Sequence, residues 1–267
     1  VMSKKNRVIF NYYAWIYLFF NILTILGGTL VRATDSRAGC GKHWPLCNGV
    51  LLPDINILKT FIEFSHRMSS AVLGIGGLIL FIWGLLITPK KDIVRFSVSA
   101  VLFLIIFEAL LGASLVIFGL VENDSSLTRI VVMALHLIST FLLIASVTFT
   151  CLWSSKSFAH FNSQQVNTKI LRPVLTCIFI LLLIGVTGSI TALGDTVFKP
   201  NYVGENFFKE LVDPSHILKF LRGFHPIIAV FGTIYSFSIV LNLCPLHKKN
   251  FMQNKINILT VIFLFLL

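Results

Sequence analysis

Hydrophobic and polar positions in this chain alternate on the scale of whole segments. Long apolar stretches are separated by short polar connections. About 20 apolar residues in a helix cross a bilayer, and we therefore predict six spans. They cover residues 11–31, 61–87, 94–118, 130–152, 173–193 and 217–243. A seventh apolar stretch begins near Ile256, but the residues from Lys255 to Leu267 are too few to cross ~30 Å of hydrocarbon at ~1.5 Å per residue.

The spans pair off as two similar blocks, which predicts an all-α polytopic membrane bundle with an internal repeat. The first span ends in Gly27-Gly28-Thr29 before a long outer loop, and the fifth ends in Gly185-Val186-Thr187-Gly188 before another. We interpret the chain as two four-helix halves, 1–153 and 154–267, related as a parallel repeat. The second half is expected to be truncated, lacking its last helix and a half.

Composition agrees with a membrane protein. The 267 residues are 56% hydrophobic and only 12% charged, with a mean hydropathy of +0.87. A soluble domain carries roughly 25% charged residues. The composition therefore argues against a soluble globular class.

The net charge of +11 follows the predicted topology. Connections on one side of the membrane are basic and hold a single acid, Asp92, whereas the loops on the other side are acidic. By the positive-inside rule the N-terminus is cytoplasmic, or in the matrix of an organelle. We expect a multi-pass protein of the bacterial inner membrane with no nucleic-acid partner. The inner basic residues are Lys4, Lys5, Arg7, Lys90, Lys91, Arg95, Lys156, Lys169, Arg172, Lys248, Lys249 and Lys255.

Three histidines, His66, His136 and His225, lie inside predicted spans, each about two turns from the outer end. Ionisable groups at such depth usually face the bundle interior and serve a function. Their spans run from outside to inside, which places the rings roughly 8–12 Å below the outer boundary at ~1.5 Å rise per residue. The residues one turn later are small and leave room for a flat macrocycle. These small residues are Ser70, Thr140 and Ala229.

The matched pair His66 and His136 predicts a haem iron held between two helices that run in the same direction, because haem iron accepts axial histidines. Packed polar side chains are the alternative. Zinc is less favoured, since no further His or Cys lies at ligand spacing within the spans. Glu108 and Arg129 could line this site or its entrance, or form a structural pair.

One carboxylate distinguishes the two halves. Glu63 precedes His66 by three residues, so both project from one helix face. A partly buried carboxylate beside a metal site is a candidate acid, base or electrostatic group; a pair between Glu63 and Arg67 is the alternative. The matching position before His225 is Arg222, which suits a haem propionate. We infer that the Glu63 half performs chemistry and the Arg222 half holds an electron carrier.

Two of the five cysteines, Cys40 and Cys47, lie in an outer loop with glycine and proline between them. The outer side permits disulfides. A structural disulfide and a redox-active pair both remain open. We expect free thiols at Cys151, Cys177 and Cys244.

Together these motifs resemble haem A synthase. The resemblance rests on sequence segments spread over nearly the whole chain, and the cysteine loop followed by Glu-x-x-His is its most specific part. The segments are Gly27-Gly28-Thr29-Leu30-Val31-Arg32, Cys40 to Cys47 with Trp44-Pro45, Glu63-Phe64-Ser65-His66-Arg67, Ala134-Leu135-His136-Leu137, Ala192-Leu193-Gly194-Asp195-Thr196 and His225-Pro226.

The resemblance implies an eight-helix oxidoreductase that converts the C8 methyl group of haem O to the formyl group of haem A through successive hydroxylations. Haem A then serves terminal cytochrome oxidases. The resemblance also implies that His66 and His136 flank the substrate haem, that Glu63 is the essential acid and that His225 is one axial ligand of a haem b. The implied partners are haem O, haem O synthase and a membrane electron acceptor, and self-association stays open.

The resemblance further implies a Cys40–Cys47 disulfide that takes part in electron transfer. The chain departs from the family pattern at two places. Pro226 follows His225 where many relatives have arginine, and residues 194–216 hold no second cysteine pair. The partner of His225 would lie in an eighth helix that this chain lacks.

A non-enzymatic b-type cytochrome is the main alternative function. It would share the paired histidines but would not need Glu63 or the cysteine loop. A transporter is a weaker third interpretation, because the histidines lie near the outer face and signals of broken helices are scarce.

Overall fold

The fold is all-α, with six helices in the part of the chain that is described. The computed structural model describes residues 4–121, 124, 126–155, 168–197 and 217–243, with some side chains near the ends of the last two helices left out. The helices are α1 (Lys4–Ala33), α2 (Leu58–Ile87), α3 (Ile93–Ile117), α4 (Leu127–Ser154), α5 (Thr168–Val197) and α7 (Ile217–Leu243).

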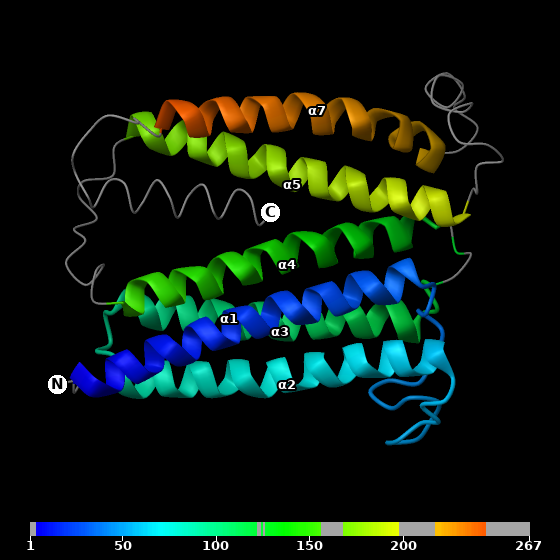
Figure 1. The fold of residues 1–267 in the computed structure, drawn as a ribbon, viewed down its shortest axis with the longest axis horizontal. Coiled ribbons are helices and arrows are strands. Elements are labelled where there is room, and N and C mark those ends of the chain that lie inside the picture. Colours follow the sequence, from blue (N-terminus) through cyan, green and yellow to red (C-terminus); the bar gives the residue numbers. More distant parts are fainter. Residues whose placement is uncertain (1–3, 122–123, 125, 156–167, 198–216, 244–267) are drawn as a thin grey trace. The chain divides into compact units, whose positions relative to one another are not determined.

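The chain divides into two compact units, Val1–Phe161 and Asn162–Leu267. In the first unit α1 packs against α2 and α4, and α3 packs against the same two helices. Among the described residues α2 and α4 make no direct backbone packing contact, so they lie diagonally opposite each other. Successive helices run in opposite directions (Figure 1), and α2 and α4 therefore both begin at the end that carries the loop after α1.

Local sequence explains where α3 and α4 begin. The Asp92 carboxylate accepts a hydrogen bond from the Val94 N–H at 2.9 Å, and the Ser126 hydroxyl accepts one from the Arg129 N–H at 3.2 Å. Such side-chain caps satisfy N–H groups that have no partner within the helix. At the other end of the unit, Arg7 donates to the carbonyls of Trp153 and Ser154. The first turn of α1 thereby satisfies the last turn of α4.

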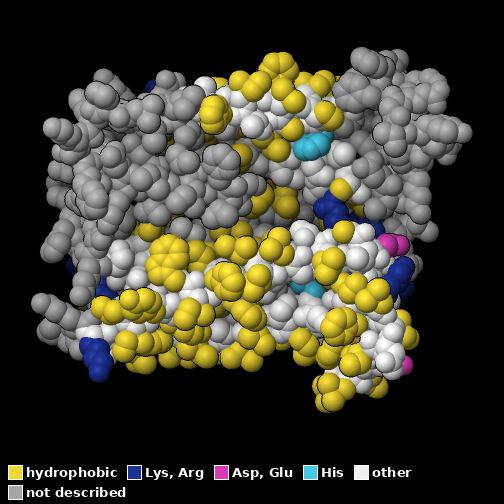
Figure 2. Space-filling model, in the orientation of Figure 1, with side chains coloured by type: hydrophobic (Ala, Val, Ile, Leu, Met, Phe, Trp, Pro, Cys, Tyr) yellow, Lys and Arg dark blue, Asp and Glu magenta, His cyan; other side chains and the backbone are white. Residues whose placement is uncertain are grey.

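The hydrophobic core of the first unit fills only the half near the start of α1. Phe10, Tyr17, Leu80, Val98 and Val147 are among its buried members. These residues come from the first half of α1 and α3 and the second half of α2 and α4. Figure 2 shows hydrophobic side chains across the visible face of this unit, with charged side chains gathered toward its ends. The other half of this unit, at the end that carries the α1–α2 loop, holds His66 and His136.

The predicted helix positions agree with the structure to within a few residues, apart from the first, which begins at Lys4 rather than residue 11. Five helices are long and apolar enough to cross a membrane, and a shorter apolar helical stretch, Gly223–Ile239, lies within α7. These findings support a multi-pass membrane protein. Two predictions lie outside the described residues: the apolar stretch that begins near Ile256, and the free thiol at Cys244. In the second unit, α5 packs against α7.

Candidate functional site

The loop between α1 and α2 is closed by a disulfide between Cys40 and Cys47, both fully buried. The predicted pairing is confirmed. The Thr60 hydroxyl donates to the carbonyl of Gly39 at 2.8 Å, and so joins the loop to the first turn of α2. Cys151 and Cys177 are free and buried, as expected.

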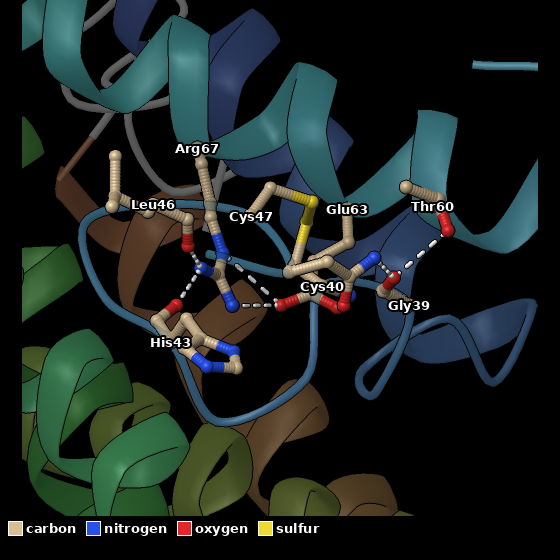
Figure 3. The surroundings of a disulfide bond; sticks show 9 residues. Gly39, Cys40, His43, Leu46, Cys47, Thr60, Glu63 and Arg67 are labelled. Carbon is tan, nitrogen blue, oxygen red and sulfur yellow. Dashed lines mark hydrogen bonds and ion pairs between the residues drawn. A yellow bond between two sulfur atoms is a disulfide. The ribbon is translucent and has the colours of Figure 1, made fainter. Parts of the chain in front are cut away.

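Glu63 and Arg67 attach this loop to α2 more strongly (Figure 3). The Glu63 carboxylate, 4% exposed, accepts the Cys40 N–H at 2.9 Å and the Arg67 guanidinium at 2.5 and 3.1 Å. Arg67 also donates to the carbonyls of His43 at 2.6 Å and Leu46 at 2.7 Å. The Glu63–Arg67 pair, which was one of two alternatives for Glu63 in the sequence, is therefore present. It orders the cysteine loop at the end of the helix bundle.

Replacing Arg67 with alanine is expected to destabilise the protein by about 3 kcal/mol, because removing one partner of a buried ion pair leaves the other charge uncompensated. Thermal melting of the purified protein in detergent measures the effect. Lys59→Ala is the matched control, since Lys59 and its partner Asp35 are both largely exposed and 3.9 Å apart; exposed pairs contribute ~0–1 kcal/mol. Equal melting of the two variants would contradict the assigned role of Arg67.

His66 lies on α2 with its ring against α1. A Cβ atom added at Gly28 would come 3.0 Å from Cε1 and 3.2 Å from Nε2 of His66, whereas one added at Gly27 would be 3.5 Å from Nδ1. The ring approaches the α1 backbone so closely because Gly28 has no side chain. The Ser70 hydroxyl, one turn on, donates to the His66 carbonyl at 2.8 Å.

We expect Gly28→Ala to displace the His66 ring and to weaken haem binding to the first unit roughly 10- to 100-fold, as disturbing the partner that orients a ligand does. Titration with haem b, followed by absorbance, measures the change. Gly27→Ala is the control, because its added methyl group would make only an ordinary contact. Equal losses in both variants would indicate a general effect on α1 and not on His66.

His136 lies on α4 and contacts a carboxylate from α3. Its Nδ1 is 2.5 Å from Oε2 of Glu108. The other carboxylate oxygen accepts hydrogen bonds from Ser139 at 2.5 Å and Thr140 at 2.9 Å. Glu108 thus lines the candidate site, one of the two roles considered for it. Arg129, 1% exposed, donates to the Asp124 carbonyl at 2.6 Å at the start of α4.

His66 and His136 lie at the same end of the first unit. They lie near the start of α2 and α4, which are diagonally opposite, and their rings are near enough to interact electrostatically. Both residues are partly buried, and the His66 ring also interacts with the backbone of Thr24 on α1. Haem iron accepts two axial histidines, so two imidazoles at one end of a helix bundle are candidate ligands for one haem.

The second unit repeats part of this arrangement. Nδ1 of His225 is 3.0 Å from the Thr187 hydroxyl. A Cβ atom added at Gly188 would come 3.1 Å from Cε1 and 3.4 Å from Nε2 of His225, much as Gly28 does with His66. The side chain of Arg222 lies outside the described residues.

Sequence reasoning missed three of these contacts: Gly28 with His66, Glu108 with His136, and Thr187 with His225. The predicted small residues lie on the same helix as each histidine, whereas the glycine that the ring approaches lies on the neighbouring helix in both units. The Gly27-Gly28 and Gly185-to-Gly188 segments were the available signal.

Residues 54–267 match the COX15-CtaA family model, described as cytochrome oxidase assembly protein. The chain belongs to this family. The match includes Glu63 and all three histidines, and it begins after the cysteine loop.

Relatives of this COX15-CtaA member carry two different names. A protein of Thermus thermophilus named protoheme IX farnesyltransferase is 38% identical over 225 residues, which cover 84% of this chain and 36% of the relative. A heme A synthase of Shouchella clausii is 37% identical over 144 residues, 54% of this chain and 44% of the relative. A heme A synthase of Alkalihalophilus pseudofirmus is 38% identical over 148 residues, 55% and 47% respectively. The chain therefore spans between about a third and a half of these relatives.

Proposed function

We propose that this protein is a haem A synthase that oxidises the C8 methyl group of haem O to a formyl group. The observation that carries the proposal is the placement of His66 and His136 at one end of the first unit, on diagonally opposed helices, with buried Glu63 three residues from His66. Family membership and the heme A synthase relatives support the same conclusion.

In this proposal the first unit binds the substrate. His66 and His136 hold the iron of haem O from its two faces and orient the macrocycle. Converting a methyl to a formyl group adds one oxygen atom and, with water as its source, releases four electrons and four protons. The reaction therefore needs water, an electron acceptor and a nearby group that takes protons. Glu63 is the assigned acidic group, since it is the carboxylate on the His66 helix and lies one turn from that ring. A second role, in ordering the cysteine loop, is compatible with this one.

The second unit is proposed to hold a resident haem b. Its residues fit that cofactor: the Thr187 hydroxyl contacts Nδ1 of His225, which leaves Nε2 as the ring nitrogen for an iron, and Gly188, which has no side chain, lets the ring lie close to α5. Arg222 is proposed to bind a propionate. A bound haem b supplies one-electron transfer. The similar glycine–histidine contacts in the two units support an internal repeat, with halves 1–153 and 154–267.

The remaining assignments concern the surroundings of the protein. We propose that it lies in a bacterial inner membrane with a cytoplasmic N-terminus, as the basic inner connections indicate. Haem O synthase is the proposed source of substrate, and a membrane carrier the proposed electron acceptor. The Cys40–Cys47 disulfide is proposed to order the outer end of the first unit, and its participation in electron transfer is a separate hypothesis.

Pigment extraction tests this function. The protein is produced in cells that make haem O but no haem A, and the haems are separated by chromatography. A haem A synthase yields haem A. Bound haem b with no haem A would instead identify a b-type cytochrome, the alternative that the histidines alone would also fit.

A further inference from the structure

Glu108 is a second buried carboxylate in the first unit, and it belongs to a different helix from Glu63. Its side chain is 12% exposed in the second half of α3. An ionisable group inside a membrane-spanning helix is costly unless it is paired. Its only described polar neighbours come from α4. Ser139 and Thr140 donate to Oε1, and Nδ1 of His136 lies 2.5 Å from Oε2.

The two hydroxyls hold the carboxylate in place from one side. Each hydroxyl shares its single proton between Oε1 and a backbone carbonyl of α4, that of Leu135 for Ser139 and that of His136 for Thr140. Oxygen Oε1 therefore accepts the hydrogen bonds from the two α4 hydroxyls, and Oε2 faces the imidazole of His136. The Nδ1–Oε2 pair is a close contact between the imidazole and the carboxylate, without the alignment of a hydrogen bond.

We propose that Glu108 is the positioning residue for His136: it accepts the Nδ1–H and so presents Nε2, with its lone pair, to the iron of the bound haem. A histidine ligand has two nitrogens, and the hydrogen bond at one decides which is free for the metal. Metal-bound histidines commonly donate their second ring N–H to a carboxylate, which fixes the tautomer and ring orientation and makes the ligand more basic.

The inference explains an asymmetry within the site. No carboxylate contacts the His66 ring among the described residues; this ring interacts with the backbone of Thr24 and lies against Gly28, both on α1. The two axial ligands would therefore differ: one held against the backbone of a neighbouring helix, and one held by a carboxylate. The inference rests on the proposed function only in that His136 binds a haem iron.

A double-mutant cycle tests it. All variants carry His225→Ala, so that titration with haem b reports the first unit. We expect Glu108→Ala to weaken haem binding roughly 10- to 100-fold, and His136→Ala to weaken it more. Because Glu108 acts through His136, adding Glu108→Ala to His136→Ala should cause no further loss, a non-additivity that separates positioning from general stabilisation.

Two further variants keep the test decisive if Glu108→Ala folds poorly. Glu108→Gln retains the shape and an oxygen acceptor, and its affinity should lie between those of the parent and Glu108→Ala. Thr148→Ala, which removes an α4 hydroxyl that donates to the Ile144 carbonyl and has no described contact with Glu108 or His136, should bind haem as the parent does. The absorption spectrum of the bound haem should change in Glu108→Ala and Glu108→Gln and not in Thr148→Ala.

The outcomes distinguish this inference from the proposed function. If Glu108→Ala lowers haem affinity equally in the parent and in the His136→Ala background, Glu108 is a structural residue and the inference is overturned. Haem A formation by the parent protein would be unaffected by that result. Unchanged haem affinity in His136→Ala would overturn the ligand assignment and the inference together.

Discussion

Replacing Glu63 with glutamine is expected to abolish haem A formation while haem remains bound. Glutamine has nearly the same shape, and its amide oxygen can still accept the Cys40 N–H that the carboxylate accepts at 2.9 Å. It cannot take a proton from the reaction, and loss of such a group typically costs roughly 100- to 10,000-fold in rate. Extracted pigments should therefore contain haem O and haem b but no haem A.

The structure also makes a purely structural role for Glu63 testable, because the same carboxylate pairs with Arg67. Arg67→Met removes the pair and the two bonds to the loop carbonyls of His43 and Leu46 but retains the carboxylate. If Glu63 acts in the chemistry, Arg67→Met should retain haem A formation at a level matching its folded fraction, and Glu63→Gln should retain none. Equal haem A per folded molecule in the two variants would contradict the catalytic assignment.

Removing either histidine of the first unit should prevent substrate binding. His66→Ala and His136→Ala each take away one axial ligand, so affinity for haem should fall by more than the roughly 10- to 100-fold that losing a ligand's orienting partner costs. Haem A should then be absent for lack of bound substrate. Titration of each purified variant with haem b in the His225→Ala background measures the loss.

Two controls show whether this loss is specific. His43 is exposed in the cysteine loop, and its described hydrogen bond is made by its backbone carbonyl, so His43→Ala should bind haem normally. His225→Ala alone should lower the haem b content of the protein and leave the first-unit site able to bind haem. Retention of haem by both His66→Ala and His136→Ala would contradict the paired-ligand assignment.

The sequence predicted the elements that depend on local patterns. Apolar stretches identified all six described helices, and the positions of His66 and His136 placed both rings at one end of the first unit because their helices run in the same direction. The i, i+4 spacing of Glu63 and Arg67 also indicated their pairing correctly. The Cys40–Cys47 pairing agreed as well.

What the sequence could not predict depends on contacts between helices. Glu108 is far from His136 along the chain, and only the rotation of α3 against α4 brings its carboxylate to the ring. The groups that Arg67 binds in the loop are backbone carbonyls, which any residue supplies and no residue type marks. The close approach of His66 to Gly28 likewise depends on how α1 packs beside α2.

The most direct test of the central claim is conversion of haem O by the purified protein. Haem O is bound to the protein, an artificial electron acceptor is added, and the porphyrins are extracted and identified by mass spectrometry. We predict haem A from the parent protein and unchanged haem O from Glu63→Gln under the same conditions. Recovery of unchanged haem O from parent protein that has bound it through His66 and His136 would contradict the proposed function.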